Sequence, residues 1–117
     1  MATKVGSTLL AATSNAAGST TTSATLNMSA AETGFITAQV TNGSPGPGAP
    51  CVATVNVSPD GATFYPAYSA TAQIGNSVVS TFLFEFPPAT MYANVTFSGN
   101  TTNAVTVAAQ SQIETAF

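Results

Sequence analysis

The sequence predicts an all-β protein: an antiparallel two-sheet β-sandwich, jelly-roll or immunoglobulin-like, with about eight short strands. Short segments in which apolar and polar residues alternate recur along the 117 residues, as in strands with one buried face. Turn residues separate these segments at intervals of about 8 to 12 residues. Thr and Ser, which disfavour helix interiors, are abundant. Because this length fits one core, we expect a single sandwich domain over residues 1–117.

The first third of the chain is rich in Ala, Ser and Thr and has the weakest pattern. Thr8 to Thr13 alternates weakly, and Thr22 to Met28 alternates more clearly. Asn15 to Gly18 is predicted to be a turn or loop between them. The residues that share one face of the second segment are Ala24, Leu26 and Met28. Within this domain we expect residues 1–20 to form a flexible N-terminal arm.

The middle of the chain has stronger strand signals. Phe35 to Thr41 is β-branched and aromatic, and it ends in the turn dipeptide Asn42-Gly43. Three prolines in Ser44 to Pro50 fix φ and remove backbone donors, which predicts a rigid exposed loop. Cys51 to Val57 then alternates, and the Pro-containing sequence Ser58 to Gly61 predicts a turn. The residues on one face of that strand are Cys51, Ala53, Val55 and Val57.

Four strands are predicted after that turn. Thr63 to Tyr68 contains a proline, so it should be short or lie at a sheet edge. Val78 to Phe86 is apolar on both faces, which is typical of a central strand. Met91 to Ser98 alternates cleanly, and a Gly-Asn turn leads into Val105 to Ile113. The residues predicted to point inward from the third of these strands are Met91, Ala93, Val95 and Phe97.

Charged residues make up only 4% of the chain, against roughly 25% in an ordinary protein. They are Lys4, Glu32, Asp60, Glu85 and Glu114. A single Lys and no Arg exclude nucleic acid and anionic membranes as partners, because both need several cationic groups. No apolar run approaches the ~20 residues of a membrane span. A neutral surface of short side chains orders at low entropic cost, so we expect a homo-oligomer, with a soluble monomer as the alternative.

The residues of common catalytic and metal sites are missing. The chain has no His, hence no imidazole base or metal ligand. Cys51 has no second Cys to pair with and is predicted to be a buried, inert thiol. Asp60 fits a plain turn better than a Ca²⁺ site, and the loop from Gly43 to Ala49 lacks the Lys of a phosphate-binding loop. We therefore expect no catalytic residue, cofactor or metal, and no enzyme activity.

Two further residue sets have plain explanations. Asn-x-Ser/Thr triplets begin at Asn27, Asn42, Asn56, Asn94 and Asn100. In a chain this rich in Asn, Ser and Thr, such triplets arise by chance, although in a secreted eukaryotic protein they would be glycosylation sites. The aromatic residues that fit a carbohydrate platform are Phe64, Tyr65, Tyr68 and Tyr92. Without Trp or neighbouring acids, a role in the core is the favoured interpretation.

Nearly the whole chain resembles small virion proteins of tailed bacteriophages that decorate or cement a capsid. The resemblance is carried by "MATKVGSTLLAATSNAAGSTTTSATLNMS", "GFITAQVTNGSPGPGAPCVATVNVSPDGATFY" and "FEFPPATMYANVTFSGNTTNAVTVAAQ". It implies a β-sandwich made in the host cytoplasm that becomes part of the virion at the capsid surface. There it would be a dimer or trimer that clamps neighbouring subunits of the major capsid protein. No functional residue carries over, because such proteins act through surfaces.

Three functions follow from these observations. The first is a structural virion protein that binds the outer capsid surface and stabilises the lattice. The second is an adhesive or glycan-binding β-sandwich module of a phage fibre or cell surface, and the third is a minor hydrolase with an unfamiliar site. For capsid contact we expect the N-terminal segment from Ala2 to Ala17 and the loop from Gly43 to Pro50, which lie outside the core pattern.

Overall fold

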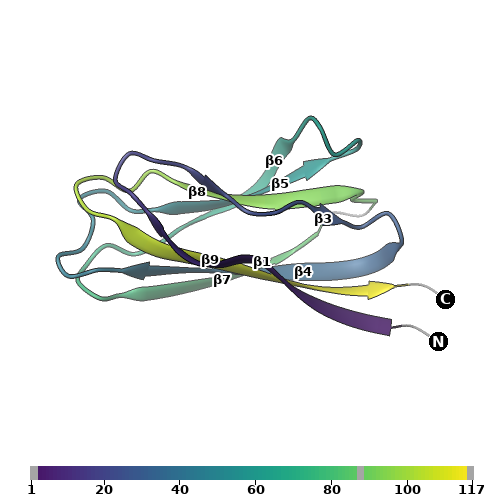
Figure 1. Cartoon of the computed structure of the whole chain (residues 1–117), viewed down its shortest axis with the longest axis horizontal. Coiled ribbons are helices and arrows are strands. Elements are labelled where there is room, and N and C mark those ends of the chain that lie inside the picture. The colour runs from purple at the N-terminus through teal and green to yellow at the C-terminus, as the bar shows by residue number, and fades with distance from the viewer. Residues whose placement is uncertain (1–2, 87–88, 116–117) are drawn as a thin grey trace.

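The computed structural model describes residues 3–86 and 89–115, and these form strands, turns and loops (Figure 1). Its strands are β1 (Thr3–Asn15), β2 (Thr21–Thr22), β3 (Leu26–Asn27), β4 (Ala31–Asn42), β5 (Val52–Ser58), β6 (Tyr65–Thr71), β7 (Val79–Glu85), β8 (Tyr92–Ser98) and β9 (Val105–Thr115). None of the described residues lies in a helix long and apolar enough to cross a membrane. The all-β prediction is confirmed.

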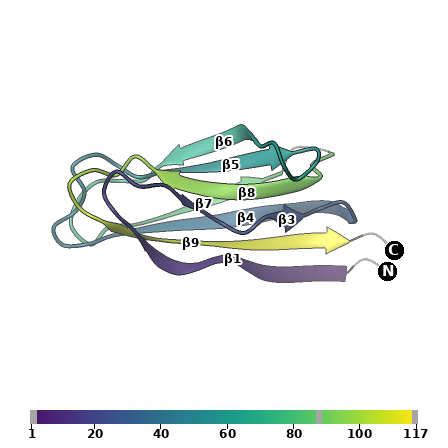
Figure 2. The same cartoon turned by 45° about the horizontal axis from the view of Figure 1, so that its top comes forward.

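The strands form two facing antiparallel sheets. Sheet A has the order β1-β9-β4-β7, and sheet B has the order β2-β8-β5-β6, with β3 also paired to β8 (Figures 1 and 2). Strand β1 therefore pairs with β9, β2 and β3 pair with β8, β4 pairs with β7, and β5 pairs with β6. The chain thus resembles one long hairpin that is folded into two layers. This is the jelly-roll arrangement, which decides between the two sandwich types that the sequence left open.

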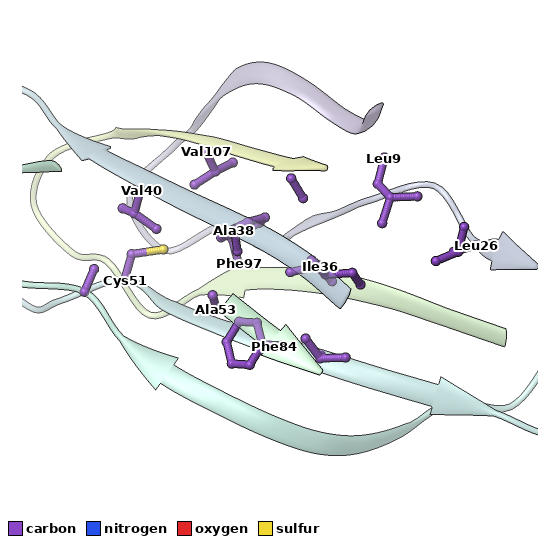
Figure 3. Close-up of a cluster of buried hydrophobic side chains, with 14 of the residues drawn as sticks. Leu9, Leu26, Ile36, Ala38, Val40, Cys51, Ala53, Phe84, Phe97 and Val107 are labelled. Atoms are coloured by element: carbon purple, nitrogen blue, oxygen red, sulfur yellow. The ribbon is translucent and has the colours of Figure 1, made fainter. Parts of the chain in front are cut away.

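The core lies between the sheets and follows the predicted alternation. In the middle of β4 every second residue is fully buried, namely Ile36, Ala38 and Val40. Opposite them lie Cys51, Ala53 and Val55 before and along β5, and Ala93, Val95 and Phe97 of β8. Figure 3 shows many of these side chains pointing into the space between the two layers. The predicted inward faces of these segments are confirmed with two exceptions: Met91 lies outside β8 and is exposed, and Val57 is only half-buried, beyond the register shift between Val55 and Asn56.

Within the expected flexible arm of residues 1–20, residues 3–15 form a strand, and residues 1 and 2 lie outside the described residues. Thr3–Asn15 is strand β1, paired with β9 from Thr3 opposite Thr115 to Asn15 opposite Val105. Most side chains of β1 remain in solvent, and Leu9 is its one buried apolar residue. Its weak apolar pattern therefore reflects a strand held mainly by backbone hydrogen bonds to its neighbour. The two-residue strands β2 and β3 explain why the chain has more strands than expected.

Strand β7 also differs from its prediction, since it lies at the edge of sheet A rather than in the centre. On its inner face Phe84 is buried and Phe82 packs against the core. On the outer face, however, Val79 and Leu83 are 53% and 64% exposed. Apolar residues on both faces therefore mark an uncovered surface here, not a strand covered on both sides.

Candidate functional site

Four connections meet at one end of the sandwich, which we call the loop end (Figure 1). They join β1 to β2, β4 to β5, β6 to β7 and β8 to β9. A network of asparagine side chains holds them together. Asn15 Nδ2 donates to Asn100 Oδ1 at 2.6 Å, and Asn100 Nδ2 donates to the carbonyls of Asn15 and Asn103, both at 3.1 Å. Because Asn15 and Asn100 are buried, their amide groups replace the water that the loop backbone would otherwise need.

The proline-rich loop is part of the same end, and hydrogen bonds hold it to the neighbouring connections. Gly46 N donates to Asn76 Oδ1 at 2.8 Å, and Asn103 Nδ2 donates to the Gly46 carbonyl at 2.9 Å. A Cβ on Gly46 would overlap the backbone of Gly75, so this close approach requires glycine. Asn42 Nδ2 holds the β6–β7 connection through the carbonyls of Gln73 and Gly75. Hydrogen bonds thus join the four connections of the loop end into one surface.

The asparagine triplets can now be judged by burial. Asn42, Asn94 and Asn100 are buried in the folded chain. Asn42 and Asn100 serve the loop end, and Asn94 Oδ1 accepts a hydrogen bond from Asn56 Nδ2 at 3.0 Å. Buried amides already engaged in hydrogen bonds are inaccessible to a glycan-transferring enzyme. Their structural roles explain these asparagines without glycosylation.

At the opposite end, the outer face of sheet A has a hollow of about 350 Å³. It is lined by Lys4, Thr33, Gly34, Phe35, Glu85, Gln112, Ile113 and Glu114. Strand pairing explains this set: Lys4 lies opposite Glu114, and Phe35 lies opposite both Glu85 and Gln112. The structure thus gathers three charged residues that are far apart in the sequence. An aromatic ring, two carboxylates, an ammonium and an amide fit a small polar ligand with one apolar face.

Among the described residues, the fold brings two of the chain's carboxylates together in this hollow. Glu85 and Glu114 share the hollow, whereas Asp60 lies in the β5–β6 connection. Within residues 3–86 and 89–115, no three His, Cys, Asp or Glu side chains form a group that could hold a metal ion. Sequence reasoning missed Phe35 and Gln112 as lining residues, because alternation alone does not show which outward positions become neighbours.

Beyond this hollow, the described outer face of sheet A carries no charged side chain, and it is polar apart from exposed apolar residues such as Val79 and Leu83 on β7. A second hollow of about 240 Å³ is lined by Thr37, Gln39, Thr81, Ala108, Ala109 and Gln110 of β4, β7 and β9. Together with the first hollow it makes a long surface of hydroxyl and amide groups with charge at one end only. Such a face can bury against a protein surface without the cost of desolvating unpaired charges.

The side of the sandwich between β6 and β7 is open, and it corrects the prediction for the aromatic residues. Tyr65 and Tyr68 on β6 are exposed rather than in the core. Tyr68 lines a hollow of about 360 Å³ with Ser69, Leu83, Phe84 and Glu85. Tyr68 is exposed because β6 is the last described strand of sheet B, so nothing covers it from the side.

Cys51 has the environment predicted for an inert thiol. It is fully buried beside β5, and burial raises the pKa of the thiol, an effect only partly offset by hydrogen bonds from the backbone of Ser98 and Val52. A thiol-reactive dye should therefore modify Cys51 only when the protein unfolds, because the thiolate is the reacting species. Rapid labelling of the folded chain, at the rate seen in denaturant, would contradict this prediction.

Asp60 organises the β5–β6 turn. Its Oδ1 accepts hydrogen bonds from Ala62 N at 2.9 Å, Thr63 N at 3.0 Å and the Ser58 hydroxyl at 3.0 Å. These bonds, that from Thr63 first, hold the pKa of the Asp60 carboxyl below its ordinary value. The carboxylate is thus a turn-forming group, as the sequence predicts.

A pH titration tests this role. A carboxyl whose pKa is lower in the folded state stabilises the fold above its unfolded pKa, and that stabilisation is lost on acidification below about pH 4. We expect Asp60→Asn to have a lower melting temperature than the natural protein at neutral pH, with a difference that shrinks as the pH falls. Melting curves from pH 7 to pH 2 measure this, and parallel curves for the two proteins would refute the role of the charge.

Comparison with known proteins shows what the chain resembles. No protein-family model matches the sequence, and no curated protein matches it. The fold is similar to that of the PBSX exported protein XepA, with a TM-score of 0.66 and 7% identity over 97% of this chain. This chain spans only 38% of the length of XepA. At this identity the likeness shows the fold alone.

Two further solved structures share the fold. The SPBc2 prophage-derived protein YomS has a TM-score of 0.52 and 10% identity, and the match covers 98% of this chain and 96% of YomS. A family 16 carbohydrate-binding module has a TM-score of 0.51 and 14% identity over 84% of this chain and 71% of that module. The same β-sandwich thus occurs both in prophage-derived proteins and in a carbohydrate-binding module.

Proposed function

We propose that this protein is a structural virion protein of a tailed bacteriophage that binds the outer capsid surface and stabilises the lattice. The observation that carries the proposal is the long outer face of sheet A, which carries charged side chains at one end only. Its short hydroxyl and amide side chains lose little entropy when they are buried, and they pair with backbone groups of either polarity. The likeness to XepA and YomS and the resemblance of the sequence to capsid-decorating proteins support this function.

The proposed partner is the major capsid protein, and sheet A supplies the contact. Its long strands β1, β4 and β9 make a broader platform than the strands of sheet B. Both expected contact elements adjoin this platform, because β1 is its edge and the loop from Gly43 to Pro50 follows β4. The rigid loop end favours a fixed position on a lattice, since little further order is required on binding.

A matched pair of variants tests the capsid contact. Thr37→Arg places a charge in the middle of the outer face of sheet A, and Thr54→Arg places the same charge on the central strand β5 of sheet B. We expect the first change to reduce capsid occupancy at least 10-fold and the second to leave it unchanged, as counted by mass spectrometry of purified particles. Cryo-electron microscopy should place the protein on the capsid. Absence from natural particles, or presence only in the tail, would refute the proposal.

A second candidate function, glycan binding, is favoured by the charged hollow of sheet A. A sugar ring can stack on Phe35 while its hydroxyl groups bond to Glu85 and Gln112. The likeness to a carbohydrate-binding module supports this alternative at the level of fold. A glycan array with the natural protein and Phe35→Ala tests it: binding that the variant loses would support it, and no binding to any glycan would reject it.

A further inference from the structure

The edge strands of the two sheets differ in how well they are protected. An edge strand exposes unpaired backbone groups that can pair with another chain, and proteins block this with Pro, Lys, bulges or very short strands. Strand β1 has Lys4 and two register shifts, and β6 has Pro66 and one register shift. Strands β2 and β3 have two residues each. Three of the four edges in the described structure are therefore protected.

Strand β7 has none of these protections. It contains neither Pro nor Lys, and it pairs with β4 in unbroken register, from Phe35 opposite Glu85 to Thr41 opposite Val79. Its outer face exposes Val79 and Leu83, and the open hollow beside Tyr68 borders it. An unprotected, regular and partly apolar edge is typical of a strand that pairs with another chain.

The hydrogen bonds to β4 show which backbone groups of β7 point outward. Asn42 N donates to the Val78 carbonyl at 2.9 Å, and Phe86 N donates to the Gly34 carbonyl at 3.3 Å. In an antiparallel pair, residues that bond to one neighbour alternate with residues that face away from it. Ser80, Phe82 and Phe84 therefore bond to β4. The outward-facing backbone groups belong to Val79, Thr81, Leu83 and Glu85.

We propose that β7 pairs with β7 of a second copy of this chain, around a two-fold axis at Phe82. This register places Val79 opposite the partner's Glu85 and Thr81 opposite the partner's Leu83, so every outward backbone group meets a bonding partner. Phe82 faces the partner's Phe82 as a non-hydrogen-bonded pair, the closer of the two pair types. The two sheets A become one continuous sheet across the axis.

The charge on β7 and the two-fold symmetry of the pairing both favour a second copy of this chain as the partner of β7. Glu85 is the single charged residue of β7, and the two-fold arrangement places it opposite the partner's Val79, six positions along the strand from the partner's Glu85. An identical strand thus meets no opposed like charges, which would be destabilising. The interface is isologous, so one unprotected edge in each copy is enough to close the dimer. In this dimer the second copy also lies against the open side of the sandwich between β6 and β7, and it covers Leu83.

Light scattering during gel filtration of the purified chain tests this pairing independently of capsid binding. We expect a mass of twice 11.6 kDa. Leu83→Lys should give monomers, whereas Val5→Lys, an exposed apolar residue on the protected edge of the same sheet, should remain dimeric. Leu83→Pro should also give monomers with an unchanged circular dichroism spectrum, because the N–H it removes points away from β4. A monomeric natural protein, or dimers that survive both Leu83 changes, would overturn the proposal.

Disulfide trapping tests the register. In a Cys51→Ser background, Phe82→Cys should form a cross-linked dimer on mild oxidation, and Ser80→Cys should not, because Ser80 lies opposite the partner's Phe84. If Phe82→Cys does not fold, the double change Thr81→Cys and Leu83→Cys reports the same register from exposed positions. Equal cross-linking at 80 and 82 would refute it. If the chain is monomeric and β7 pairs only with a strand of a capsid subunit, the partner of β7 is that subunit and not a second copy of this chain.

Discussion

Replacing Asn100 with Ala is expected to lower the free energy of unfolding by about 2 to 4 kcal/mol. Asn100 is 0% exposed, and its side chain accepts one hydrogen bond and donates two. The change removes all three and leaves the Asn15 amide and two carbonyls without these partners in a site that excludes water. Because Asn15 and Asn103 belong to two different connections, the loop end should loosen as a whole.

Chemical denaturation measures this effect, with Asn27→Ala as the matched control. Asn27 is exposed and accepts one hydrogen bond, from Ser29 N, so its loss should cost less than about 1 kcal/mol. If the two variants lose the same stability, the asparagine network is not what holds the loop end. A double variant with Asn15→Ala should lose less than the sum of the two single changes, because both act on the same bonds.

Replacing Phe97 with Ala is expected to cost about 3 to 5 kcal/mol, the largest effect of any single change proposed for this chain. Phe97 is the largest side chain that is completely buried, and it lies on β8 between the two sheets (Figure 3). Its removal leaves a cavity lined by β-sheet residues, which cannot move closer without breaking strand pairing. For a domain whose total stability is about 5 to 15 kcal/mol, such a loss leaves little margin.

Tyr65→Ala is the control for the Phe97 change, since Tyr65 is 58% exposed on the edge strand β6. It removes an aromatic ring of similar size from solvent rather than from the core, so we expect a loss below about 1 kcal/mol. Thermal and denaturant unfolding of both variants makes the comparison. Equal losses would mean that the space between the sheets is not the main source of stability.

Some of the fold follows from the sequence because the responsible signals are local. Side chains alternate sides along any strand, so Ala53 and Val55 had to share a face, and Pro and Gly had to interrupt pairing wherever they clustered. The same local chemistry identified the Asp60 turn and the proline-rich loop before Cys51. The absence of His and Arg likewise limits the chemistry that any arrangement of this chain can perform.

Neighbours across the sheets were decided only by the tertiary structure, because strand order depends on pairing between distant segments. Asn15 and Asn100 are 85 positions apart, yet one hydrogen-bond network joins them. Strand β1 gave only a weak alternation from Thr8 to Thr13, because few of its apolar side chains are buried and backbone pairing with β9 holds it over its whole length.

The all-β sandwich, its turns and its lack of imidazole chemistry were therefore determined by the sequence itself, through residue type and a period of two. The tertiary structure alone decided that Lys4, Glu85 and Glu114 share a hollow, and that β7 is an unprotected edge. The physical reason is that the composition determines which chemical groups the side chains carry, whereas the order of the strands in the two sheets determines which side chains become neighbours.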